Sequence, residues 1–286
     1  MVKSHLVATL TTAGMLLVVP ASVPNSSLRA MDGPGSSPIV SIVGPPPGTD
    51  SLAVEWVSVT APRLGVLLAA VARPPGAGPF PTLVLLHGSH GFAHEYVGLA
   101  RDLSAGGVLA VAACWFRGAG GSGIRFVTPI ACPEAPPVTP GASSPEMIQT
   151  VEALVQAART LPGARPDRVA LFGHSRGGGV VLNYLLRTSN VQAAVLNSAG
   201  YPGELSTNIT APILMLHGTA DSPADGGVAV TNIRMARDFE AKLRASGKPV
   251  EAVYYEGGRH NDLFGNPTQY RDEVHRISTF LLRHLQ

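Results

Sequence analysis

Residues 168–182 read Arg-Val-Ala-Leu-Phe-Gly-His-Ser-Arg-Gly-Gly-Gly-Val-Val-Leu, an apolar strand pattern that runs directly into an apolar helix pattern. The junction is a Gly-x-Ser-x-Gly pentapeptide at residues 173–177. In a sharp strand-to-helix turn, both glycines let the neighbouring backbone pass, and the serine between them is held in a strained, exposed conformation. The stretch therefore predicts a nucleophile elbow centred on Ser175. The alternative is a glycine-rich turn with an incidental serine.

Two other stretches accompany this pentapeptide. Leu-Leu-His-Gly at residues 85–88 ends one apolar run, and Leu-His-Gly-Thr-Ala-Asp at residues 216–221 ends another. Together the three stretches resemble the α/β-hydrolase fold, in particular its dienelactone-hydrolase-like branch, over roughly residues 50–286. Enzymes that hydrolyse dienelactone carry a cysteine where this chain has Ser175, so the resemblance implies the architecture and not the substrate.

The composition is consistent with one large α/β domain. The 286 residues suffice for a single well-buried core. Charged residues make up only 14% and the formal net charge is +2, with no run of lysines or arginines, so nucleic acid is not an expected partner. The 32 glycines and 25 prolines indicate extensive ordered loops, because apolar residues still make up 45% of the chain.

The first residues have the order of a signal peptide. Lys3 supplies a basic start, residues 6–19 are apolar with interspersed threonines, and small residues precede a cleavage site after Ala21. The apolar stretch is short for a membrane span of about 20 residues, so we expect a secreted or periplasmic protein; an uncleaved segment would be a membrane anchor instead. Residues 22–50 lack periodicity and are expected to be an extended linker.

From residue 51 onward, strand and helix patterns alternate as in a doubly wound sheet. The runs 53–60 and 65–72 favour an antiparallel hairpin at the sheet edge. Further strands are expected at 82–86, 108–113, 168–172, 191–196, 213–216 and 250–255, and helices at 92–105, 145–159, 175–187, 232–245 and 268–284. The expected fold class is α/β, with a mostly parallel doubly wound sheet and an antiparallel N-terminal edge, in one catalytic domain over residues 51–286.

Ester cleavage by serine needs a base that takes the hydroxyl proton and an acid that orients the base. In the α/β-hydrolase fold these residues follow one another as Ser, then Asp or Glu, then His. Asp221 and His260 each follow an expected buried strand, and loops at the carboxyl ends of parallel strands converge on one crevice. We therefore expect Ser175 as nucleophile, His260 as base and Asp221 as its acid. Asp225 is a competing acid, and the alternative for His260 is a surface loop residue.

The oxyanion of such a reaction needs two backbone N–H groups. In this fold one comes from the residue after the nucleophile, here Arg176, and one from the loop after an early strand. We expect Ser89 to supply the second, with His90 as the runner-up, because Gly88 lets that loop approach the nucleophile. His87 is expected to bond loop backbone.

Three imidazoles, those of His87, His90 and His94, fall within eight residues and suggest a metal site. No carboxylate or cysteine spacing completes such a site, so neither a metal nor any other cofactor is expected. His90 is instead a candidate for the substrate pocket.

Residues 115–145 form a Pro- and Gly-rich excursion, and loops of this length are usually functional. Trp115, Phe116 and Phe126 are therefore candidates for an apolar acyl pocket, against the alternative that they pack the loop onto the domain. Cys114 and Cys132 are the only cysteines, and because export favours oxidation we predict that they pair.

These patterns together predict an exported serine hydrolase that cleaves small-molecule or polymer carboxylic esters through an acyl-enzyme. One alternative is a peptidase of the same fold. Another is a non-catalytic binding module, against which the intact serine, aspartate and histidine positions argue.

Overall fold

The computed structural model describes residues 37–118, 127–138, 144–201 and 209–286, which belong to one compact unit spanning Ser36–Gln286. The predicted signal peptide and most of the predicted linker lie outside these residues, as does Phe126. None of the helices that the structure describes is both long and apolar enough to cross a membrane.

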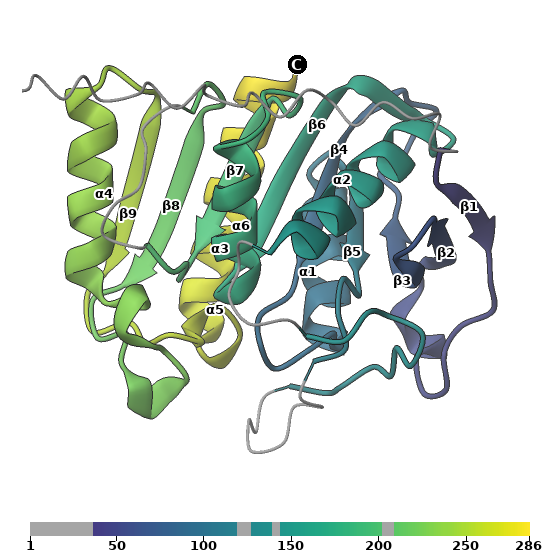
Figure 1. Cartoon of the computed structure of the whole chain (residues 1–286), viewed down its shortest axis with the longest axis horizontal. Helices are drawn as coiled ribbons and strands as arrows, with labels where there is room; N and C mark the ends of the chain where they lie inside the picture. Colours follow the sequence, from purple (N-terminus) through teal and green to yellow (C-terminus); the bar gives the residue numbers. More distant parts are fainter. Residues whose placement is uncertain (1–36, 119–126, 139–143, 202–208) are drawn as a thin grey trace, which may run out of the picture. The chain divides into compact units, whose positions relative to one another are not determined.

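The described residues build a nine-stranded sheet in the order β1-β2-β3-β5-β4-β6-β7-β8-β9 (Figure 1). The strands are β1 (Ile39–Ile42), β2 (Glu55–Ala61), β3 (Gly65–Ala72), β4 (Phe80–Leu86), β5 (Leu109–Ala113), β6 (Ala164–His174), β7 (Ala193–Asn197), β8 (Ile213–Gly218) and β9 (Val250–Tyr255). The pairings β1–β2, β2–β3 and β3–β5 are antiparallel, and all the others are parallel. The expected fold class, a mostly parallel sheet with an antiparallel N-terminal edge, is therefore confirmed.

Helices cover both faces of this sheet (Figure 1). They are α1 (His94–Ala105), α2 (Pro145–Thr160), α3 (Arg176–Leu185), α4 (Ile233–Ala245), α5 (Asp262–Gly265) and α6 (Pro267–Leu285). One apolar cluster joins the sheet to α2, α3 and α4, and a second joins it to α1 and α6. Successive residues of a strand point to opposite faces, so Val84 and Leu86 belong to the first cluster and Leu83 and Leu85 to the second. This double burial explains the uninterrupted apolar run of β4.

The sheet begins earlier in the chain than the sequence pattern predicts. Strand β1 lies inside the expected linker, residues 22–50, and pairs with β2 from Ile39 opposite Thr60 to Ile42 opposite Val57. The β2–β3 hairpin is therefore one strand inside the sheet edge. The sequence gives no clear strand pattern at residues 39–42, because β1 is short and covers little of the core. Ile39 and Ile42 are 63% and 75% exposed.

Candidate active site

The nucleophile elbow lies between β6 and α3. Ser175 has φ 53° and ψ −115°, a conformation that costs a non-glycine residue free energy and is typical of functional sites. The glycines around it are sterically required. A Cβ on Gly173 would lie 2.3 Å from the carbonyl carbon of Gly177, and one on Gly177 would lie 2.2 Å from the oxygen of Leu86. The Ser175 N–H donates to Asn197 O at 2.9 Å, which ties the elbow to the end of β7.

The structure brings Ser175, His260 and Asp221 together in one hydrogen-bonded chain. The Ser175 Oγ lies 2.8 Å from His260 Nε2, and His260 Nδ1 lies 2.7 Å from Asp221 Oδ2. A carboxylate only accepts, so Nδ1 carries the proton and Nε2 is left to accept the serine hydroxyl proton. His260 is 2% exposed and Asp221 6%, so both side chains are shielded from water.

Three side chains surround the Asp221 carboxylate. His260 and Thr231 donate to it, the latter from its Oγ1 to Oδ1 at 3.0 Å. The Nε2–H of His217 is shared, because Nε2 lies 2.7 Å from Thr231 O and 3.3 Å from Asp221 Oδ2. Burial alone would raise the pKa of Asp221, but the hydrogen bonds and charges of His217 and His260 outweigh it and hold the pKa at about 2. The acid is therefore ionised at neutral pH.

The two candidate acids differ in what their side chains contact. Asp225 accepts from Ser222 Oγ at 3.3 Å, and its Oδ1 lies 3.7 Å from the Arg259 guanidinium. Its carbonyl oxygen accepts from Asn261 at 2.6 Å. The carboxylate beside His260 is thus that of Asp221.

The loop at residues 87–91 comes close to the nucleophile. A Cβ on Gly88 would lie 3.3 Å from Ser175 Cβ. Within this loop the N–H of Gly88 donates to Tyr96 Oη at 2.8 Å, and the N–H of Gly91 donates to Gly88 O at 3.1 Å. The N–H groups of Ser89 and His90 donate to no acceptor in the described part of the chain, which leaves these two as the loop's candidate oxyanion donors. Across from them α3 begins at Arg176, so the N–H expected as the other donor belongs to the first turn of a helix.

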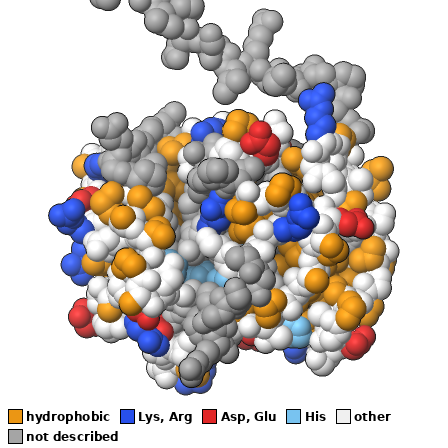
Figure 2. All heavy atoms as spheres, turned by 60° about the horizontal axis from the view of Figure 1, so that its bottom comes forward, with side chains coloured by type: hydrophobic (Ala, Val, Ile, Leu, Met, Phe, Trp, Pro, Cys, Tyr) orange, Lys and Arg blue, Asp and Glu red, His pale blue; other side chains and the backbone are white. Residues whose placement is uncertain are grey.

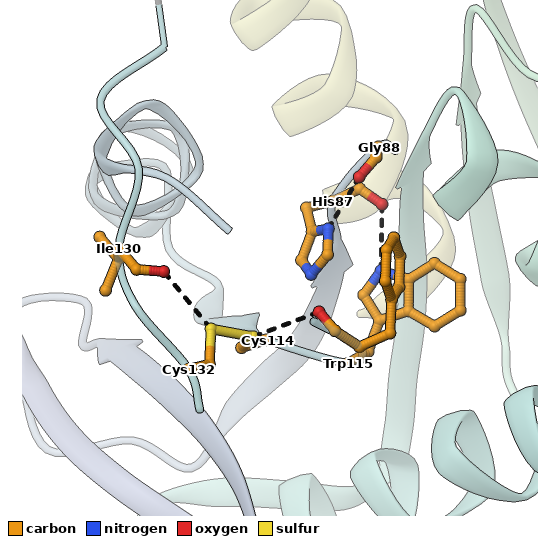
Figure 3. The surroundings of a disulfide bond; sticks show 7 residues. His87, Gly88, Cys114, Trp115, Ile130 and Cys132 are labelled. Carbon is orange, nitrogen blue, oxygen red and sulfur yellow. Dashed lines mark hydrogen bonds between the residues drawn. A yellow bond between two sulfur atoms is a disulfide. The ribbon is translucent and has the colours of Figure 1, made fainter. Parts of the chain in front are cut away.

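The aromatic residues proposed for an acyl pocket lie in the core instead. Trp115 and Phe116 are each 1% exposed. The indole Nε1 of Trp115 donates to His87 O at 3.0 Å (Figure 3), and the Phe116 ring centroid is 4.6 Å from that of His87. The geometry therefore favours the alternative that these two residues pack the loop onto the domain. Phe126 lies outside the described residues.

His87 begins the loop at residues 87–91, the candidate oxyanion loop, and supports the backbone of this loop. His87 is fully buried, and its Nδ1 donates to Gly88 O at 2.9 Å (Figure 3). Burial lowers the pKa of His87 to about 3, so the ring is neutral. His90 is 8% exposed and borders a surface hollow of about 360 Å³ with Arg117 and residues 129–133. Neither Ser175 nor His260 lines this hollow, so the pocket role of His90 stays a prediction.

A disulfide joins Cys114, just after β5, to Cys132 in the long excursion (Figure 3). The neighbouring residues bond to the chain that enters α1. Ile130 N donates to Phe92 O at 2.9 Å, and His94 N donates to Thr128 O at 2.9 Å. The described part of the excursion is therefore fixed beside the oxyanion loop.

All of these groups lie at the carboxyl ends of the strands, the lower edge in Figure 1. Figure 2 turns this edge toward the reader and shows histidine side chains in a hollow. No group of three histidine, cysteine or carboxylate side chains among the described residues is placed to hold a metal ion. Sequence reasoning assigned no role to His217, although it stands in a quoted stretch, and found no signal for Thr231, which lies in an irregular loop ten residues after Asp221.

Comparison with known proteins agrees with this architecture. A family model described as "Serine aminopeptidase, S33" (Hydrolase_4) matches residues 77–206, less than half of the chain. A putative dienelactone hydrolase from Klebsiella pneumoniae is 22% identical with a TM-score of 0.57, and the alignment covers 77% of this chain and 92% of that one. The esterase rPPE, in the form of a point mutant, is 19% identical with a TM-score of 0.61, covering 82% of this chain and 85% of that one.

Esterase 2 of Thermogutta terrifontis is also similar in structure. Its form phosphonylated by cyclosarin is 15% identical with a TM-score of 0.58, covering 76% of this chain and 89% of that one. The chain described here therefore has the α/β-hydrolase fold.

Proposed function

We propose that the protein is a serine hydrolase of carboxylic esters that acts through an acyl-enzyme. The observation that carries the proposal is the hydrogen-bonded chain from Ser175 Oγ through His260 to the Asp221 carboxylate, with its serine on a positive-φ elbow. This arrangement makes a hydroxyl nucleophilic at neutral pH without a metal ion.

In the proposed reaction, Ser175 Oγ attacks the ester carbonyl carbon while His260 Nε2 takes the hydroxyl proton. The N–H groups of Arg176 and of Ser89 or His90 donate to the oxyanion of the tetrahedral intermediate. The intermediate collapses, and the alcohol leaves with the proton from His260. Water then attacks the acyl-enzyme by the same route, with His260 as base, and releases the carboxylic acid and the free Ser175 hydroxyl.

The ionised Asp221 orients the His260 ring and stabilises the imidazolium that forms in each half of the reaction. Hydrogen bonds hold its pKa at about 2, below the ordinary aspartate value near 3.9. The Asp221 carboxylate is therefore charged at neutral pH, and it loses that charge only as the pH falls through about 2.

The direct test is covalent labelling of the purified protein by a fluorophosphonate probe, followed by mass spectrometry of the labelled peptide. We expect one adduct, on Ser175, together with hydrolysis of p-nitrophenyl esters; rates across increasing acyl lengths then define the acyl preference. The esterase phosphonylated by cyclosarin supports the choice of probe. Absence of both labelling and hydrolysis would favour the non-catalytic binding module.

A peptidase is the second candidate, and the match to the serine aminopeptidase model favours it. It would use the same residues on an amide. Parallel assays with amino-acid p-nitroanilides and p-nitrophenyl esters separate the two. We expect kcat/KM to be higher for the esters, and the reverse order would replace esterase by peptidase.

We also propose that the protein is exported, with cleavage after Ala21. The basic, apolar and small-residue order of residues 1–21 supports this, as does the Cys114–Cys132 disulfide, because disulfides persist in oxidising compartments. N-terminal sequencing of secreted material should begin at residue 22. An intact Met1 on protein recovered from membranes would show an anchor instead.

A further inference from the structure

Beside the nucleophile lies a buried tyrosine hydroxyl for which the reaction described above has no role. Tyr96, on α1, is 1% exposed. Its Oη lies 2.8 Å from Gly88 N, 2.9 Å from His90 Nε2 and 2.8 Å from His174 Nδ1. One hydroxyl therefore joins α1, the oxyanion loop and the residue that immediately precedes Ser175.

The protons of this cluster have one consistent arrangement. His174 Nε2 lies 3.3 Å from His260 O, which only accepts, so that nitrogen carries a proton. Burial, with the nearby His260 and His90 adding to it, lowers the pKa of His174 well below its ordinary value. The ring is therefore neutral, and its Nδ1 accepts the hydroxyl proton of Tyr96.

The remaining two contacts follow from this assignment. The Tyr96 oxygen has donated its single proton to His174 and has two lone pairs left. One accepts the N–H of Gly88, and the other accepts an N–H from His90 Nε2. Every polar atom at the hydroxyl then has a partner, as a buried polar cluster requires.

This network connects the parts that must be aligned in the reaction. Gly88 directly precedes the candidate oxyanion donor Ser89, and His174 directly precedes the nucleophile. Through His174 Nε2 the network also reaches the backbone carbonyl of His260. No member of the cluster carries a net charge, so its effect on the oxyanion comes from the orientation of the loop N–H groups and not from an added ion.

We propose that Tyr96 is a positioning residue for the reaction: its hydroxyl fixes the oxyanion loop relative to Ser175 and, through His174, to the backbone of His260. The inference rests on the proposed ester hydrolysis. The Tyr96 hydroxyl should stabilise the transition state more than the bound substrate. A loop N–H displaced by a few tenths of an ångström still lets substrate bind, but it stabilises the oxyanion less.

The test compares Tyr96→Phe with a matched control, Tyr184→Phe. Tyr184, on α3, is also fully buried, and its hydroxyl bonds to Glu152 and, at 2.9 Å, to Asn190, away from the nucleophile. Both changes keep the ring and remove one buried hydroxyl. Each variant is measured for Tm, for kcat and KM on a p-nitrophenyl ester, and for inhibition by an alkyl boronic acid, which forms a tetrahedral adduct on serine.

We expect Tyr96→Phe to lower kcat by roughly 10- to 100-fold, less than the loss of a whole oxyanion donor, with KM nearly unchanged and boronic acid inhibition weakened by a similar factor. Tyr184→Phe should keep kcat and boronic acid affinity within about twofold even where its Tm falls equally. A Tyr96→Phe enzyme with wild-type kcat and boronic acid affinity would overturn the proposal. Because the wild type is assayed alongside, an inactive wild type would instead count against ester hydrolysis itself.

If Tyr96→Phe does not fold, substitutions of His90 test the same network. A glutamine at this position keeps an N–H donor for Tyr96, and a leucine does not, while both keep the backbone. His90→Gln should retain several-fold more kcat than His90→Leu, with similar KM for the two. Equal kcat values in the two variants would refute the network.

Discussion

On one side of Ser175 an ionised carboxylate holds His260, whereas on the other side the oxyanion loop is held by groups without charge. Asp221 has a pKa of about 2, kept low against burial by hydrogen bonds from His217 and His260. On the opposite side burial lowers the pKa of His90 to about 4 and raises that of Tyr96 well above its ordinary value, so both are neutral at pH 7.

The difference follows from the charge that each side would stabilise. The base becomes an imidazolium, so a permanent negative charge beside it lowers the energy of the transition state. The oxyanion is stabilised by fixed dipoles, whose strength depends on direction and on the exclusion of water. Substitutions of Ser175, which both sides serve, and of residues on either side should therefore differ in their effects.

Removing the nucleophile should have the largest effect. Ser175→Ala should lower kcat on an ester by roughly 10⁴-fold or more, because the covalent path is lost, and His260→Ala should cost a similar factor. The double mutant should be scarcely slower than either single one, because the residues act as a unit. Circular dichroism and Tm should stay near wild type. Full esterase activity in Ser175→Ala would refute the mechanism.

The charged side is tested by exchanging carboxylate for amide. Asp221→Asn should reduce kcat severely, by up to roughly 10⁴-fold, because an amide neither fixes the His260 tautomer nor stabilises its charged form. Asp225→Asn is the matched control and should be nearly silent, since its side chain faces Ser222 and Arg259. The opposite ranking of the two variants would move the acid to Asp225.

Removing the Cys114–Cys132 disulfide tests whether the loop at residues 87–91 needs the neighbouring excursion to be held in place. Replacing both cysteines by serine should lower the free energy of unfolding by about 3 kcal/mol, the chain-entropy value for a loop of this length. Activity should fall far less than in Asp221→Asn. Urea unfolding and kcat measure the two effects. Alkylation without reductant, followed by mass measurement, should add no label to the wild type, and two labels would show free thiols.

A second buried carboxyl sharpens the contrast with Asp221. Glu273, on α6, is fully buried; one carboxyl oxygen accepts from Gln269 Nε2 at 2.8 Å, and the other lies 2.5 Å from the side-chain amide of Asn197. A protonated Glu273 donates its O–H to the oxygen of that amide, for which the amide is turned over. Burial, which here outweighs the Gln269 hydrogen bond, raises the pKa of Glu273 to about 8. The folded protein thus keeps this proton at a pH where the unfolded chain has lost it.

The pH dependence of stability should reveal that proton. The contribution of the Glu273 proton to the free energy of unfolding is complete below the ordinary glutamate pKa near 4.3. It is lost as the pH rises to about 8. Between pH 5 and pH 7 the wild type should therefore lose on the order of 2 kcal/mol relative to Glu273→Gln, which cannot ionise. Urea unfolding of both proteins at the two pH values measures this, and parallel profiles would show that Glu273 is ionised when folded.

How far sequence reasoning reaches depends on whether a feature is local. The elbow was predictable because its turn is local: the clash that excludes a Cβ at Gly173 is with Gly177, four residues further along the chain. The parallel strands were predictable because burial on both faces leaves an uninterrupted apolar run. Strand β1 was not, since its side chains are largely exposed.

The sequence by itself determined the fold class, the elbow at Ser175 and the loops that carry Asp221 and His260, because these follow from periodicity, steric requirement and chain order. Only the tertiary structure decided that Asp221 and not Asp225 contacts His260, that Trp115 is buried, and that Tyr96 meets His174. The physical reason is that a loop or helix side chain takes its direction from packing against residues distant in the chain, and no local pattern encodes that direction.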